Sequence, residues 1–220
     1  MHRKLHVREL GRLPYGQAWD LQKSLSEQRK QSLIEDQLLL LEHPHVLTVG
    51  RNGHLENLLI SSDRLRDLGI ELHEINRGGD ITYHGPGQII GYPIIDLREW
   101  KRDVVAYVRA LEEVIIRTLK RYGIEGVRDP GATGVWVNGA KICALGVHIS
   151  RWVTTHGFAL NWTTDLKYFQ YIVPCGLTRP VTSMEQLGVR VDREALHQAL
   201  VEEFADVFEF EPALENAPVL

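Results

Sequence analysis

Cysteine is scarce in this chain, as are long apolar runs and net charge. Two cysteines in 220 residues cannot form a disulfide framework, so both thiols are expected to be free in a reducing, cytoplasmic setting. No run of 18 apolar residues occurs, which argues against a membrane-spanning helix, and the basic amino-terminal stretch lacks the apolar core of a secretion signal. The formal net charge of −4 provides no general attraction to nucleic acid. The composition therefore favours a cytoplasmic globular protein that binds neither membrane nor nucleic acid.

Familiar cofactor signatures are also missing. There is no Gly-x-x-x-x-Gly-Lys-Ser/Thr phosphate loop, and Gly85, Gly87 and Gly91 are spaced one residue too far for a dinucleotide fingerprint. The ten histidines and two cysteines show no spacing typical of a zinc site, so most histidines are expected to be core or surface residues. We predict no metal and no cofactor.

What remains is the composition of an ordinary enzyme-sized domain, with 44% apolar and 25% charged residues. We predict a single domain over residues 1–220. Apolar periodicity and capping residues predict helices at 15–30, 62–67, 103–122, 182–185 and 192–208. Strands are predicted at 37–41, 46–49, 70–77, 81–84, 88–97, 134–137, 140–149 and 151–161, with a tight hairpin turn at Asn138-Gly139. The irregular order of these elements predicts an α+β fold with mixed or antiparallel sheets packed against helices.

The segment from Arg77 to Gln88 contains four glycines, a cation, a hydroxyl and an imidazole within twelve residues. Glycine lets a backbone approach a ligand closely, because no Cβ stands in the way. Period-two alternation would place Asp80, Thr82 and His84 on one face of a strand. That face either lines a site or belongs to a solvent-exposed glycine-rich turn.

Lys141 and the two cysteines are the candidates for covalent or proton-transfer chemistry. A lysine in an apolar strand either reaches water from an edge or lines a pocket, where desolvation favours the neutral amine. Cys175 lies between Pro174 and Gly176 in a predicted turn, which exposes a side chain. Cys143 lies two residues from Lys141 and is expected on the same face of an extended strand. Position alone does not decide which thiol reacts.

Four segments, in order along the chain, resemble the lipoyl(octanoyl) transferases, which move an octanoyl group from acyl carrier protein to a lipoyl domain. The segments are Arg77-Gly-Gly-Asp-Ile-Thr-Tyr-His-Gly-Pro-Gly-Gln88, Gly139-Ala-Lys-Ile-Cys-Ala-Leu-Gly146, His156-Gly-Phe-Ala-Leu-Asn161 and Pro174-Cys-Gly-Leu177. The resemblance extends through most of the chain. It implies the fold of the biotin and lipoate protein ligases, which is an α+β fold.

The resemblance also implies roles for particular residues. Cys175 would carry the acyl group as a thioester, and Lys141 would favour its thiolate and later accept a proton from the attacking amine. Backbone amides near Leu145 and Gly146 would hold the thioester oxygen. The acyl pocket implied by the resemblance consists of Arg77, Gly78, Gly79, Asp80, Ile81, Thr82, Tyr83, His84, Ala144, Leu145, Gly146, Gly157, Phe158 and Ala159.

The expected donor is octanoyl-acyl carrier protein. The expected acceptors are the lipoyl domains of 2-oxoacid dehydrogenase E2 subunits and the glycine cleavage H protein, and we expect a monomer. Three alternatives stay open at this point. They are an ATP-dependent lipoate-protein ligase on the same fold, a cysteine hydrolase in which His84 or His156 serves Cys175, and a non-catalytic acyl-binding module.

Overall fold

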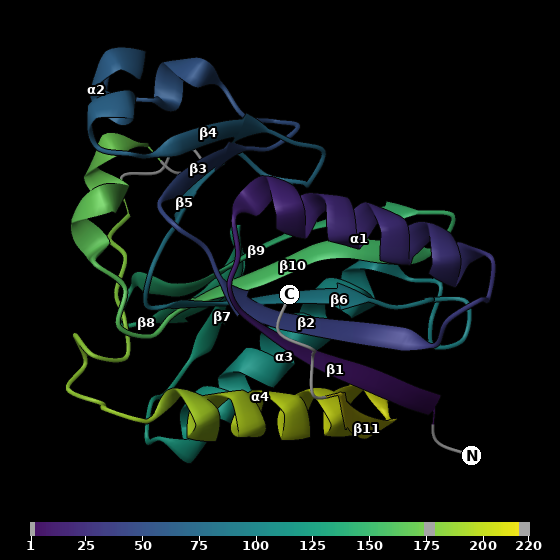
Figure 1. The fold of residues 1–220 in the computed structure, drawn as a ribbon. Helices are drawn as coiled ribbons and strands as arrows, with labels where there is room; N and C mark the ends of the chain where they lie inside the picture. Colours follow the sequence, from purple (N-terminus) through teal and green to yellow (C-terminus); the bar gives the residue numbers. More distant parts are fainter. Residues whose placement is uncertain (1–2, 174–178, 216–220) are drawn as a thin grey trace.

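Two β-sheets form the frame of the protein, which a computed structural model describes over residues 3–173 and 179–215 (Figure 1). Within these residues the larger sheet has eight strands in the order β11-β1-β2-β6-β10-β9-β8-β7, and the smaller has three in the order β4-β3-β5. The strands of the larger sheet are β1 (Arg3–Arg12), β2 (Asp36–Glu42), β6 (Gln88–Ile94), β7 (Val127–Asp129), β8 (Ala132–Val137), β9 (Ala140–Ser150), β10 (Val153–Asn161) and β11 (Phe210–Glu215). Those of the smaller sheet are β3 (Val46–Val49), β4 (Glu71–Glu74) and β5 (Ile81–His84).

Strand directions are mixed. β1 runs parallel to β2 and to β11, and β3 runs parallel to β4. The pairs that build the centre and the far edge of the larger sheet, from β2–β6 to β7–β8, are antiparallel. Mixed sheets packed with helices confirm the predicted α+β class.

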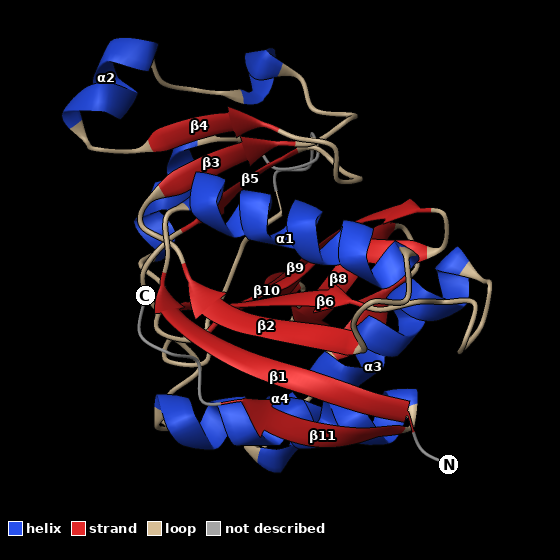
Figure 2. Cartoon of the chain, turned by 45° about the vertical axis from the view of Figure 1, so that its right-hand side comes forward, coloured by secondary structure: helices blue, strands red, loops and turns tan. Residues whose placement is uncertain are grey.

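β2 lies inside the larger sheet, and both of its faces are buried. Leu38 and Leu40 pack into the core beneath α3 (Val104–Arg121) and α4 (Arg193–Phe208), whereas Leu39 and Leu41 pack beneath α1 (Tyr15–Lys30). Because both faces are apolar, the sequence shows an unbroken leucine run instead of an alternating pattern. Figures 1 and 2 show the three layers that result, with α1 on one face of the sheet and the pair α3 and α4 on the other.

Two of the helices, α2 (Ser62–Asp67) and α3, begin at a capping side chain. Ser61 accepts a hydrogen bond from the Arg64 N–H (3.2 Å) at the start of α2, and Asp103 accepts one from the Ala106 N–H (3.0 Å) at the start of α3. The sequence predicts both starts, and the structure confirms them. Two short 3₁₀ helices, η1 (Leu55–Asn57) and η2 (Leu166–Tyr171), complete the described elements. None of the helices described is both long and apolar enough to cross a membrane.

The predicted hairpin between β8 and β9 is confirmed. Asn138 and Gly139 have φ values of 50° and 80°, and Val137 stands opposite Ala140. Positive φ at both central residues is the geometry of a type I′ turn, for which Asn-Gly is favoured. This turn fixes where β9 begins and therefore which of its residues reach the cavity described below.

Three predicted elements differ from the structure. The strand predicted at 88–97 ends at Ile94. The strand predicted at 70–77 ends at Glu74, because the following residues leave the small sheet and the Gly78 N–H donates to the Val147 carbonyl of β9 (2.9 Å). The short helix predicted at 182–185 is wrong. The Thr182 N–H is committed to the Lys141 carbonyl (3.0 Å), and Ser183 instead caps a turn by accepting from the Gln186 N–H (3.1 Å).

Candidate active site

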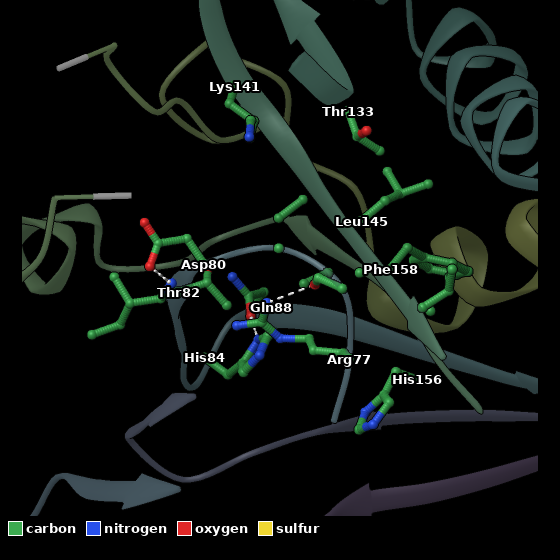
Figure 3. A pocket seen from close by; sticks show the side chains of 18 of the residues that line it. Arg77, Asp80, Thr82, His84, Gln88, Thr133, Lys141, Leu145, His156 and Phe158 are labelled. Carbon is green, nitrogen blue, oxygen red and sulfur yellow. Dashed lines mark hydrogen bonds between the residues drawn. The ribbon is translucent and has the colours of Figure 1, made fainter. Parts of the chain in front are cut away.

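One cavity of about 430 Å³ gathers most of the predicted site residues, although they come from separate parts of the chain (Figure 3). Its walls are the glycine-rich segment, β9 and β10, with Gly146 of β9 opposite Gly157 of β10. Its volume lies within the roughly 300–1,000 Å³ of small-molecule sites. The predicted residues that line it are Arg77, Gly78, Gly79, Asp80, Ile81, Thr82, His84, Lys141, Ala144, Leu145, Gly146, Gly157, Phe158 and Ala159.

Tyr83 does not line this cavity, which corrects its place in the predicted pocket. Side chains alternate along a strand, so Tyr83 points away from its neighbours Thr82 and His84. Its ring stacks on Tyr168 with 5.0 Å between centroids, and its hydroxyl lies 2.8 Å from His45 Nδ1. Tyr83 therefore stabilises the small sheet and is not expected to contact an acyl chain.

The loop that follows β3, residues 50–52, is hydrogen-bonded to the backbone of the glycine-rich segment. The Arg51 N–H donates to the Arg77 carbonyl (2.9 Å), and the Asn52 N–H donates to the Gly79 carbonyl (3.2 Å). A Cβ on Gly50 would lie 2.3 Å from the Gly79 oxygen, so only glycine fits there. The sequence alone could not place this loop, because the contacts join residues about 26 positions apart.

Asp80 stabilises the conformation of the glycine-rich segment. One of its carboxylate oxygens accepts from the N–H groups of Ile81 (2.7 Å) and His54 (3.2 Å), and the other accepts from the Asn57 amide (2.6 Å). Asp80 borders the cavity, but its charge is already bound by these three donors. Its expected role is to hold the turn before β5, with Asn57 as a partner that the sequence did not reveal.

The polar side of the cavity combines a buried cation with neutral imidazoles. The Arg77 guanidinium donates to the Thr48 carbonyl (2.7 Å) and hydroxyl (2.9 Å) and is only 8% exposed. Burial, with His43 and Arg77 nearby, lowers the pKa of His84 to about 3, and burial beside Arg77 lowers the pKa of His156 to about 3. Both rings are therefore neutral at physiological pH. Figure 3 shows Arg77, His84 and Gln88 clustered below Lys141.

The opposite side of the cavity is apolar. Val108 of α3, Leu145 and Val147 of β9, and Phe158 of β10 line it. Phe158 belongs to the large core, and Leu145 and Val147 pack against it, so packing holds this part of the wall in place. The surface suits a hydrocarbon chain, because each methylene removed from water contributes about 0.8 kcal/mol.

Lys141 is the second residue of β9, and its side chain enters the cavity through space that a glycine leaves open. A Cβ on Gly134 would lie 3.3 Å from the Lys141 Cε, and the ammonium nitrogen lies 4.8 Å from the centre of the Trp136 ring. The Lys141 backbone is bound on its outer side, where its N–H donates to the Pro180 carbonyl (2.9 Å) and its carbonyl accepts from Thr182 (3.0 Å). The stem and backbone of the lysine are thus fixed by neighbours on both sides.

Cys143 is a core residue and does not share the face of Lys141. Its side chain has no exposed surface, and it lies in the large core cluster, whereas Lys141 lines the cavity. The predicted common face is wrong because the β8–β9 register shifts between Val135 and Trp136, which breaks the alternation of side chains. Burial raises the pKa of the Cys143 thiol, so the reactive thiolate is disfavoured.

Cys175 lies outside the described residues, between two flanks that both reach the cavity. Phe169 precedes it on η2 and Val181 follows it beside Lys141, and both residues line the cavity. The role of Cys175 as the nucleophile stays a prediction.

The amides expected to hold the thioester oxygen do not point the same way. The Val147 carbonyl accepts from Gly78, away from β10, and in an antiparallel strand the N–H and C=O of one residue point to the same side. Leu145, two residues earlier, therefore directs its N–H to the same outer edge. β8 does not cover this edge at Leu145, because its pairing with β9 ends at Cys143. The Gly146 N–H points to β10 instead. Leu145 is the donor that the geometry favours.

The sequence matches the lipoyl protein ligase A/B catalytic domain over residues 14–205. This chain belongs to that family. The octanoyltransferase of Solibacter usitatus is 62% identical over 93% of this chain and 93% of its own length. That of Caldicellulosiruptor saccharolyticus is 48% identical over 93% of this chain and 89% of its own. The family predicted from the four segments is confirmed.

Solved structures confirm the fold of the lipoyl protein ligase A/B family. A bi-partite lipoate protein ligase from Thermoplasma acidophilum has a TM-score of 0.76 at 17% identity and covers 98% of this chain and 88% of its own. The biotin protein ligase from Aquifex aeolicus in complex with biotin and ATP has a TM-score of 0.56 at 11% identity, covering 93% and 70%. The predicted biotin/lipoate protein ligase-like fold is therefore observed.

Several cavity residues of this family member escaped the sequence analysis. Gln88 and Asn161 lie in the quoted segments but were not predicted to line the pocket, whereas Tyr15, Val108 and Val181 come from segments without a motif. Their apolar or aromatic neighbours in the sequence are typical of helix and strand cores, so no local pattern distinguishes them. Among the described residues, no group of three or more His, Cys, Asp or Glu side chains is placed to hold a metal ion.

Proposed function

We propose that this chain transfers an octanoyl group from octanoyl-acyl carrier protein to a specific lysine of lipoyl domains. The observation that carries this proposal is the convergence of Lys141 and three predicted acyl-pocket segments on one cavity with an apolar wall. Family membership and the octanoyltransferase relatives, at up to 62% identity, support the same reaction.

In the first half-reaction, Cys175 is the proposed nucleophile. Its thiolate attacks the thioester carbonyl carbon, the bond from that carbon to the carrier sulfur breaks, and the carrier leaves as a thiolate that takes up a proton. Lys141 as an ammonium favours the Cys175 thiolate and can supply this proton. The Leu145 N–H, on the outer edge of β9, is the proposed donor to the oxygen as negative charge develops.

In the second half-reaction, the amine of the acceptor lysine attacks the acyl-Cys175 carbonyl. The bond to Sγ breaks and the attacking nitrogen loses a proton, which the neutral amine of Lys141 can accept. An amide is more stable than a thioester, so this half drives the overall transfer. The octanoyl chain would lie against Val108, Leu145 and Phe158 throughout.

The proposed acceptors are the lipoyl domains of 2-oxoacid dehydrogenase E2 subunits and the glycine cleavage H protein. The proposed enzyme acts as a monomer in the cytoplasm and needs neither metal nor cofactor. Size-exclusion chromatography with light scattering tests the oligomeric state, and full activity in the presence of EDTA tests the absence of a metal requirement.

An ATP-dependent lipoate-protein ligase is the second candidate, because a lipoate-protein ligase A bound with ATP has the same fold, with a TM-score of 0.74 at 18% identity over 98% of this chain. The test supplies the purified protein and an apo lipoyl domain with either octanoyl-acyl carrier protein or free octanoate and ATP. Intact mass of the lipoyl domain is the readout. Octanoylation from the carrier without ATP supports the transferase, whereas modification only with ATP assigns the chain to the ligases.

The remaining alternatives are separated in the same experiment. A cysteine hydrolase would release free octanoate and leave the lipoyl domain unmodified, and an acyl-binding module would release nothing. The two nitrogens of His84 are bound inside the protein, by Gln88 and Thr48, which disfavours it as the base of a hydrolase.

A further inference from the structure

A row of buried polar side chains extends from Asn161 to the small sheet. The Thr182 carbonyl can only accept a hydrogen bond, so the Asn161 atom 3.0 Å from it is the amide nitrogen. The Asn161 oxygen then faces Gln88, whose amide nitrogen donates to it (2.8 Å). The Gln88 oxygen therefore faces His84, 2.8 Å away, and His84 Nδ1 must carry a proton. Figure 3 draws the bond between His84 and Gln88.

The opposite end of the row accommodates the same direction. Arg77 can only donate, and its guanidinium donates to the Thr48 hydroxyl oxygen (2.9 Å). The hydrogen of that hydroxyl is left for His84 Nε2, 3.4 Å away, which is bare when Nδ1 carries the proton. The Thr182 end therefore sets the tautomer of a neutral His84, and the Thr48 hydroxyl can complete the row by donating to Nε2.

We call these side chains the Thr48–Asn161 chain: Thr48, His84, Gln88 and Asn161. Their exposures are 0%, 8%, 1% and 3%, so the hydrogen bonds of the chain are shielded from bulk solvent. Asn161, Gln88 and His84 cannot reverse their directions while the Thr182 carbonyl stays in place. A network of this kind rigidifies the segments that it joins.

The chain ends where the backbone is bound to the candidate catalytic lysine. Thr182, which accepts from Asn161, also donates its own N–H to the Lys141 carbonyl, and Lys141 donates to Pro180. Residues 180–182 thus form a short parallel bridge along Lys141, and Pro180 follows Cys175 by five residues.

We propose that the Thr48–Asn161 chain is a positioning device that holds residues 180–182 against Lys141 and thereby orients this lysine for acyl transfer. This inference rests on the proposed function, since it gives Lys141 a part in catalysis. Thr48 does not line the cavity, so it affects the reaction only through its two bonded neighbours, His84 of the chain and Arg77. Arg77 at the opposite end connects the same device to the glycine-rich wall.

The decisive test compares two distant members of the chain. Thr48→Val removes the hydroxyl without changing the side-chain shape, and Asn161→Leu removes both amide bonds. Each is expected to lower the single-turnover rate of octanoyl adduct formation at least tenfold at saturating donor, with the half-saturating donor concentration within twofold. Thr48→Ser, which restores the hydroxyl, is expected to recover most of the rate. Thr118→Val is the matched control, because its buried hydroxyl bonds only within α3, to the Val114 carbonyl.

The double variant Thr48→Val/Asn161→Leu distinguishes a chain from two separate defects. If the members act as one unit, the double variant reacts about as fast as Asn161→Leu alone. Multiplied effects, or a Thr48→Val rate equal to that of the parent, overturn the proposal.

A second measurement does not depend on activity or on the survival of variants. Long-range ¹H–¹⁵N correlation spectra of the unmodified protein, with His84 assigned, are expected to show Nδ1 protonated and Nε2 bare at pH 7. Spectra that show the opposite tautomer would contradict the Thr48–Asn161 chain.

Cys175→Ser is run in the same adduct assay, so that failure of the proposed function can be distinguished. If this variant keeps the adduct, Cys175 is not the nucleophile. If it forms no adduct while the Thr48 and Asn161 variants react like the parent, only the positioning role is refuted.

Discussion

The side chain of Cys143 has no exposed surface, and burial raises the pKa of its thiol. We therefore expect Cys143→Ser to keep the octanoyl adduct and Cys175→Ser to abolish it, as measured by intact mass after mixing with octanoyl-acyl carrier protein. Cys143→Ala is the control for burying a serine hydroxyl in the core, which is costly by itself. Retention of the adduct in Cys175→Ser would transfer the nucleophile role to the core thiol.

Lys141 has two proposed duties that substitution can separate. Lys141→Ala is expected to slow both half-reactions at least a hundredfold, because both the charge and the proton acceptor are lost. Lys141→Arg keeps a cation but cannot lose its proton, so acyl-enzyme formation should suffer less than transfer to the lipoyl domain. Single-turnover rates of acyl-enzyme formation and of transfer to the lipoyl domain are measured for both variants. Equal losses in both halves would show that charge and proton transfer are not separable here.

Sequence reasoning located the residues whose chemistry is unusual for their local setting. Lys141 stands out because it interrupts an apolar strand, and Gly78 and Gly79 because they cluster with polar side chains. Asn57 and Thr48 could not be found in this way. Their significance comes from partners more than 20 residues away, Asp80 and Arg77, and neither has an unusual neighbourhood in the sequence.

At the scale of the strand, the two directions of the β9 amides lead to a test of oxyanion binding. Leu145→Pro removes the N–H that faces the outer edge and no ladder bond to β10, and we expect acyl-enzyme formation to fall about a hundredfold. Gly146→Pro would instead remove a ladder bond and is expected to lower the unfolding temperature. Adduct kinetics and thermal unfolding are measured for both. An unchanged rate in a folded Leu145→Pro variant would exclude this amide as the donor.

The elements that the sequence predicted well are those with local signals. The buried run of β2, the capped start of α3 and the Asn-Gly turn before β9 each depend on neighbours in the chain. β1 and β11 were not predicted. β1 has only two fully buried apolar residues, Leu5 and Val7, among basic and polar ones, and β11 contains a proline at an edge. β1 becomes a strand by pairing with β2 and with β11, and β11 by pairing with β1, about 200 residues away.

For the molecule as a whole, buried histidines predict a dependence of stability on pH. Burial lowers the pKa of His43 to about 4 and, with neighbouring cations and imidazoles, those of His84 and His156 to about 3. In the unfolded chain these groups take up protons near pH 6.5, so below that pH only the unfolded state is protonated. Stability is full above about pH 6.5 and falls as the pH drops towards 4, by at most about 1.4 kcal/mol per unit for each histidine.

Urea unfolding between pH 7.5 and 4.5 measures this loss. We expect His84→Gln to flatten the pH dependence, and His54→Gln, at an exposed position, to leave it unchanged. A parent protein whose unfolding midpoint is constant over this range would contradict the neutral state of the three rings.

The parallel pairing of β1 with β11 also determines how the protein bears a mechanical load. Six residue pairs, from Arg3 with Phe210 to Arg8 with Glu215, join the first and last described strands at the edge of the sheet away from the cavity. Tension applied between the two ends of the chain pulls these strands past each other lengthwise, so their hydrogen bonds are loaded together and not one after another. In a force experiment the molecule is expected to resist in shear, and the candidate site is separated from the first strands to yield by the width of the sheet.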